Sequence, residues 1–247
     1  MGLLILNAPN AWACNIIISA CGSQNYCVTG TYFVGGVQDM NGGTPPYPQK
    51  VQAGISSYNP SPMWSTSSAW TMLDNRTYSG CNAGCFAQVG WLHWYGCQSG
   101  LSGSNGTCSD GNEHVFVEWT DNSGVAQTIF YYNVPSGSET YTVIRDQNLG
   151  TYTFHWNEGA IAGPRTVNFG PSGIQNLEEV HDQDSGCCAA GSQFGGDYAN
   201  QVAFTNVTWW DGQGTAFVPQ MSPLHNGYGD VGTLTPGSNF HVWDSRC

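Results

Sequence analysis

The stretch from residue 85 to residue 119 constrains the fold of this 247-residue chain more than any other. It holds two arms, 85–95 and 114–120, which are rich in aromatic and β-branched residues and are separated by a Gly-, Ser- and Cys-rich segment. Arms of this composition with turn-formers between them are typical of β-strands. Because alternate residues of a strand share a face, Gln88 lies among aromatic residues on one face of the first arm, and Glu118 does so on the second. A Gln and a Glu in such surroundings indicate either a costly core feature or a functional site.

Short apolar runs at roughly ten-residue spacing continue along the chain, with turn signals such as 121–124 and 135–137 between them. This spacing is typical of an all-β sandwich or barrel, and we predict an antiparallel two-sheet β-sandwich. A helical period is weakly indicated only near 174–181, and the tail, 211–247, looks irregular. The predicted strands are 67–73, 86–95, 113–120, 126–132, 140–145, 151–156, 165–169 and 201–210.

The distribution of Pro and Gly suggests three regions. Residues 1–40 are predicted to form an N-terminal extended or strand segment, because their apolar runs are too short for helices. Residues 41–64 are rich in Pro and Gly and are predicted to be a loop or linker. Residues 65–247 are then the β-sandwich domain.

The charge balance excludes several classes of partner. Five Lys and Arg residues stand against 17 Asp and Glu residues, which gives a formal net charge of -12. Nucleic-acid and anionic membrane surfaces need basic groups, so neither is an expected partner. We also expect no membrane span, no cofactor and no metal, because no apolar run is long enough and no phosphate-binding loop or metal-ligand spacing of His and Cys is present.

Ten cysteines, an even number, favour disulfides and an extracellular, secreted protein, although their pairing cannot be read from the sequence. Three N-x-S/T sequons are candidate glycosylation sites, at Asn75, Asn105 and Asn206. Chance occurrence in a chain rich in Ser, Thr and Asn is the alternative explanation for each of them.

Four short motifs occur in a recognisable order: Ala-Trp at 69–70, Phe-Ala-Gln-Val-Gly at 86–90, Val-Glu-Trp at 117–119 and an acidic segment at 176–179. In this order the chain resembles the glutamic peptidases of the eqolisin type over about residues 65–210. The resemblance implies a secreted acid protein with a lectin-like antiparallel β-sandwich of the jelly-roll or concanavalin-like type, which the cysteines would staple by disulfides. It also implies a catalytic pair formed by a Gln on one strand and a Glu on another.

On this resemblance Gln88 occupies the position of the catalytic Gln, and Glu178 is the better candidate for the catalytic Glu, with Glu179 as the alternative. The chain departs from the family by a Cys-bearing insertion at 97–108 and by the lack of an apolar run around Glu178. In an active pair the carboxylate is the general base for a water, and the amide holds that water and stabilises the oxyanion. The alternative is that both side chains only form structural hydrogen bonds, because a fold does not imply a function.

Four tryptophans offer a different site. On a concave sheet they could form a platform on which sugar rings stack, which would make the chain a carbohydrate-binding module with glycans as partners. Aromatic residues at alternating positions are more often core, since they dominate β-sandwich interiors. The four residues are Trp91, Trp94, Trp119 and Trp156.

The leading hypothesis concerns the N-terminus, where Leu3, Leu4, Ile5 and Leu6 form an apolar run. Leaving four such side chains in water forfeits several kcal/mol, at about 1.5–3 kcal/mol for each. As a strand donated head-to-tail to another copy, this run would build a homopolymeric filament or surface layer, because head-to-tail contacts do not close. The alternative is that the run completes the chain's own sandwich. The acid peptidase and the carbohydrate-binding module are the second and third hypotheses.

Overall fold

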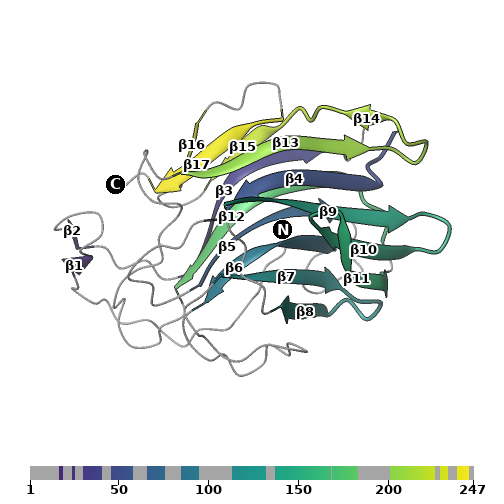
Figure 1. Ribbon diagram of the computed structural model, residues 1–247, viewed down its shortest axis with the longest axis horizontal. Coiled ribbons are helices and arrows are strands. Elements are labelled where there is room, and N and C mark those ends of the chain that lie inside the picture. Colours follow the sequence, from purple (N-terminus) through teal and green to yellow (C-terminus); the bar gives the residue numbers. More distant parts are fainter. Residues whose placement is uncertain are drawn as a thin grey trace.

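Two antiparallel β-sheets packed face to face form the computed structural model of the protein (Figure 1). The structure describes residues 17–18, 24–25, 30–40, 46–57, 66–75, 85–94, 113–131, 137–167, 169–182, 201–225, 229–232 and 238–244. The described residues contain strands and turns but no helix. The predicted all-β, two-sheet sandwich is therefore confirmed.

The first sheet has seven strands and carries the candidate site. Its strand order is β15 (Ser222–His225), β3 (Gly30–Asp39), β12 (Gly173–Asp182), β5 (Thr66–Asp74), β6 (Phe86–Trp94), β7 (Glu113–Thr120) and β8 (Ala126–Tyr131).

The second sheet has eight strands. Its order is β11 (Gly159–Thr166), β10 (Thr151–Trp156), β9 (Ser138–Asp146), β4 (Lys50–Ser56), β13 (Val202–Trp210), β17 (Phe240–Asp244) and β16 (Gly229–Gly232), with β14 (Ala216–Phe217) paired to β13. A separate two-residue pairing joins β1 (Ile17–Ile18) to β2 (Gln24–Asn25).

Several expected boundaries are corrected by the strand pairing. Strand β3 lies between β12 and β15, and β4 lies between β9 and β13, so parts of the expected N-terminal segment (1–40) and linker (41–64) belong to the sandwich body. The tail expected to be irregular contributes β14 to β17. These segments carry weak local signals, and pairing with distant strands supplies the backbone hydrogen bonds that make them strands.

Two local predictions were wrong for identifiable reasons. The possible helical turn at 174–181 is strand β12, which is paired on both sides, with β3 and with β5. The strand expected at 165–169 is β11, which begins at residue 159. The preceding turn explains that shift, because Asn157 and Glu158 both have left-handed backbone angles (φ of 47° and 67°), as the two central residues of a tight hairpin require.

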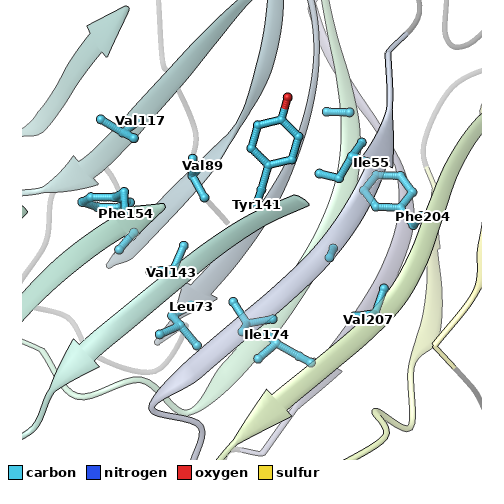
Figure 2. Packing of buried hydrophobic residues seen from close by; sticks show 14 of the residues in the cluster. Ile55, Leu73, Val89, Val117, Tyr141, Val143, Phe154, Ile174, Phe204 and Val207 are labelled. Carbon is cyan, nitrogen blue, oxygen red and sulfur yellow. The ribbon is translucent and has the colours of Figure 1, made fainter. Parts of the chain in front are cut away.

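The main hydrophobic core fills the space between the two sheets (Figure 2). Val89 and Val117 of the seven-stranded sheet face Val143 and Phe154 of the eight-stranded sheet in this core. A second buried apolar cluster lies on the opposite face of the seven-stranded sheet, which we call its outer face. This cluster contains Phe33, Val37, Trp70, Met72, Phe86, Leu92, Phe116, Phe130 and Leu177. The alternation of residues along each strand assigns every other side chain to the core or to the outer face.

The described residues test the expectations about the cysteines and the N-terminal run only in part or not at all. Cys85 is disulfide-bonded, whereas the other nine cysteines lie outside the described residues, so the wider disulfide framework stays a prediction. The assembly residues Leu3, Leu4, Ile5 and Leu6 also lie outside the described residues. In the part of the chain that the structure describes, no helix has the length and apolar character to cross a membrane.

Candidate active site

Gln88 on β6 and Glu118 on β7 are directly opposite each other in the strand register. The Gln88 Nε2 group donates a hydrogen bond of 2.7 Å to Glu118 Oε2. Thr128 on β8, also opposite Glu118, donates from Oγ1 to Glu118 Oε1 at 3.1 Å. Both members of the pair lie on the outer face, because they alternate with Val89 and Val117 of the inter-sheet core. The sequence expectation that this Gln and this Glu sit among aromatics on one sheet face is confirmed.

A second acid–amide pair lies beside the first one. Met72 on β5 is in register with Gln88 on one side and with Gln175 on the other. The Gln175 Nε2 group donates a hydrogen bond to Asp74 Oδ2. Gly173 makes this geometry possible, because a Cβ at that position would collide with the Asp74 carboxylate. We call Asp74, Gln88, Glu118 and Gln175 the acid–amide cluster.

The acid–amide cluster is buried, with exposed fractions of 2% for Asp74, 4% for Gln88, 3% for Glu118 and 2% for Gln175. Buried carboxylates need hydrogen-bond donors, and the two Gln amides supply them. The Gln88 Oε1 atom is also buried but has no hydrogen-bond partner within the described part of the chain. An orphaned buried acceptor costs about 1–3 kcal/mol, so this atom calls for an explanation such as a catalytic role or a bound water.

The structure does not bring Gln88 and Glu178 together. Glu178 is fully buried on the opposite face of β12, where Ser67 Oγ donates a hydrogen bond of 3.3 Å to its Oε1. Ile174, on the same side of the strand, belongs to the inter-sheet core. The expectation that Glu178 faces Gln88 is therefore corrected, because the alternation of side chains along β12 turns Glu178 away from the outer face.

Glu179 does lie on the outer face, where Trp70 Nε1 donates a hydrogen bond of 3.3 Å to its Oε2. Its register partner on β5 is Ser68, however, whereas the β12 residue in register with Gln88 through Met72 is Gln175. Glu179 is four positions further along β12, which corresponds to about 13 Å of strand length. Glu179 thus shares the face of Gln88 but not its immediate surroundings.

The expected sugar-stacking platform is not present in the described residues. Trp91 and Trp119 are buried in the inter-sheet core and Trp156 packs against that core, so their rings offer no open platform. The Trp91 Nε1 group donates to the Ser56 carbonyl oxygen at 2.9 Å. The side chain of Trp94 lies outside the described residues. Trp91, Trp119 and Trp156 therefore agree with the alternative expectation of core residues.

The asparagine is described in two of the three sequons. The Asn75 Nδ2 group donates to the Gly170 carbonyl oxygen at 2.7 Å, whereas Asn206 is exposed on β13 with a left-handed φ of 53°. Asn105 lies outside the described residues, and glycosylation at all three stays a prediction. Among the described residues, no group of three or more His, Cys, Asp or Glu side chains is arranged to hold a metal ion.

Solved structures of known proteins share the fold of this chain, whereas the sequence comparisons found no relative. No family model matches the chain, and no curated protein matches it. The solved structure of scytalido-glutamic peptidase with a peptide-based transition-state analogue is similar, with a TM-score of 0.52 at 11% identity, covering 88% of this chain and 100% of that one. A member of the eqolisin family in complex with a tripeptide matches over the same shares, with a TM-score of 0.49 at 11% identity. The chain has the β-sandwich fold of the glutamic peptidases, so the resemblance drawn from its short motifs is confirmed at the level of the fold.

Sequence reasoning missed Asp74 and Gln175. The parity of each strand could have placed Asp74 on the face of Trp70 and Met72, because these residues alternate along 66–74. No local signal could have placed Gln175 beside Asp74, because the pairing joins segments about a hundred residues apart.

Proposed function

We propose that this chain is a secreted peptidase of the glutamic type, which acts at acid pH with Gln88 and Glu118 as its amide–carboxylate pair. One observation carries the proposal. A glutamine amide and a carboxylate are joined at 2.7 Å on the outer face of a sandwich that shares its fold with a glutamic peptidase. The extracellular location rests on the cysteine content and on the secreted character that the eqolisin resemblance implies.

The chemistry of the pair follows from its geometry. The Glu118 carboxylate is the general base that takes a proton from a water molecule, and Gln88 orients that carboxylate through its Nε2 group. The buried Gln88 Oε1 atom is an acceptor for the same water, which would satisfy an otherwise orphaned group. Once the water has attacked a peptide carbonyl, an amide N–H is a suitable donor for the oxyanion.

A cleavage assay tests the proposal directly. The purified chain is incubated at acid pH with a denatured protein substrate, and new amino termini are counted over time. We expect cleavage by the natural chain and a loss of about 10²–10⁴-fold in Glu118→Gln, because that substitution keeps the shape of the side chain and removes the base. Glu178→Gln is the matched control, since Glu178 lies on the other face, and it should retain activity. Absence of cleavage in the natural chain between pH 2 and pH 6, or equal activity in Glu118→Gln, would refute the proposal.

A non-cleaving structural subunit is the second candidate, and one observation speaks for the absence of cleavage. The β12 position in register with Gln88 carries an amide, Gln175, which cannot act as a base. On this reading both acid–amide pairs only stabilise the sheet, and assembly into a filament or surface layer proceeds through the N-terminal run 3–6. Electron microscopy of the purified chain and of a variant lacking residues 1–13 separates the two candidates. Filaments formed only by the full chain, together with no cleavage, would support the structural subunit.

A further inference from the structure

A pocket of about 330 Å³ lies on the eight-stranded sheet, away from the acid–amide cluster. Its floor is a row of three residues in register across β9, β4 and β13, namely Ile144, Lys50 and Trp210. Their neighbours Val51, Val143 and Trp209 point into the inter-sheet core, so the row lies on the outward-facing side of this sheet. The volume falls at the lower end of the range for small-molecule sites.

Two turns, each held by hydrogen bonds to an aspartate side chain, form the walls of this pocket. In the β9–β10 turn, Asp146 Oδ1 accepts hydrogen bonds from the backbone N–H groups of Asn148 (2.9 Å) and Leu149 (3.1 Å). In the β13–β14 turn, Asp211 Oδ1 accepts from the N–H groups of Gln213 (2.9 Å) and Thr215 (2.8 Å). Each turn is thus fixed by its own aspartate, so the walls are preformed.

The two turns also touch each other. The Gln147 side chain packs so closely on Gly212 that a Cβ there would meet Gln147 Oε1 at 2.6 Å. This contact closes one part of the wall and adds a side-chain amide to the lining. A Cβ at position 212 would displace the end of the Gln147 side chain from this contact.

The lining combines an aromatic ring with hydrogen-bond donors and hydrogen-bond acceptors. Lys50, the single lysine in the chain, places its Nζ atom 3.9 Å from the centre of the Trp210 ring. Burial lowers the pKa of this ammonium group. The second carboxylate oxygens of Asp146 and Asp211 carry no hydrogen bond within the described part of the chain, so both remain acceptors.

We propose that this pocket binds a neutral hexopyranose unit of a glycan. A sugar ring offers C–H surface to an indole and hydroxyl groups to carboxylates, amides and ammonium groups, which are the groups this lining provides. Lys50 covers part of one face of the Trp210 indole. The sugar ring therefore packs on the part of the indole that Lys50 does not cover, and the Lys50 ammonium group donates a hydrogen bond to a sugar hydroxyl. The site is independent of the proposed peptidase pair, and it places glycan binding at Trp210 instead of at the tryptophans expected from the sequence.

Ligand-observed nuclear magnetic resonance tests the site with three probes: cellobiose, laminaribiose and mannobiose. We expect saturable binding of at least one probe, with a Kd in the millimolar range, which corresponds to about 4 kcal/mol of binding free energy. Trp210→Ala should weaken binding at least tenfold. Lys50→Met, which keeps the apolar stem over the indole, should weaken it to a smaller extent.

Val218→Ala is the control, because Val218 is exposed and does not line the pocket. Far-ultraviolet circular dichroism confirms that each variant is folded, and Lys50→Met remains informative if Trp210→Ala does not fold. The proposal is overturned if none of the three sugars binds saturably, or if folded Trp210→Ala and Lys50→Met bind as the natural chain does.

Discussion

The two faces of the seven-stranded sheet both bury polar side chains, but they treat them differently. On the outer face, Gln88 is joined to Glu118 and Gln175 to Asp74, so each acid receives an amide N–H group. On the inner face, both polar atoms of the fully buried Asn176 lack a hydrogen-bond partner among the described residues. Two acids of the outer face, Glu118 and Asp74, are therefore paired with amides, whereas Asn176 on the inner face lies in an apolar core with both polar atoms orphaned among the described residues.

This difference teaches that the face of a strand, and not the spacing of residues in the sequence, decides which acids can act together. Glu178 and Glu179 are adjacent, yet the first accepts from Ser67 on the inner face and the second from Trp70 on the outer face. A carboxylate buried between two sheets has no access to a polypeptide. The outer face holds the acid that contacts the candidate glutamine, Glu118.

The largest expected effect follows from removing the amide of the outer pair. We expect Gln88→Ala to lower kcat on a denatured protein substrate by about 10²–10³-fold, because both the orientation of Glu118 and the oxyanion donor are lost. Steady-state kinetics at acid pH measure this effect. Thr128→Val is the comparison, since it removes a hydrogen bond to the same carboxylate without removing the amide, and it should cost much less. A Gln88→Ala variant as active as the natural chain would show that the outer pair is not catalytic.

The next effect concerns the space that Gly173 leaves for Asp74. We expect Gly173→Ala to lower the free energy of unfolding by about 1–3 kcal/mol, because the added Cβ displaces the Asp74 carboxylate from Gln175. Urea unfolding followed by tryptophan fluorescence measures it. Gly159→Ala is the control, because a Cβ at position 159 would make no close contact with another residue. Gly137→Ala is unsuitable, because Gly137 has a positive φ. An equal loss in Gly159→Ala would argue that Asp74 is not the cause.

The smallest expected effect is on the free energy of unfolding when two neighbouring residues of β12 are substituted. The two residues lie on opposite faces of the sheet, and their substitutions should change this free energy in opposite directions. Asn176→Val should raise the free energy of unfolding by about 1 kcal/mol, because it removes orphaned polar atoms from the core. Gln175→Leu should lower it by about 1–3 kcal/mol, because it takes the amide donor from Asp74. Denaturant titrations of the two variants in parallel test the difference. If both variants change stability in the same direction, the contrast between the faces fails.

The sequence by itself determined the local part of this molecule. Alternation of apolar residues and clear turns placed β7 at 113–120 and β10 at 151–156 with the observed bounds, because each strand is long and regular enough to carry its own signal. The same alternation put Gln88 and Glu118 on sheet faces with aromatic neighbours. Short motifs along the chain were sufficient to indicate the glutamic-peptidase fold.

Only the tertiary structure decided which distant strands lie side by side. Strand β12 sits between β3 and β5, and that position turned an expected helical turn into a strand and directed Glu178 into the core. It also brought Gln175 to Asp74 and into register with Gln88 through Met72. Local sequence cannot specify such pairings, because the hydrogen bonds that fix the register join segments about a hundred residues apart, and a one-residue slip reverses every side chain.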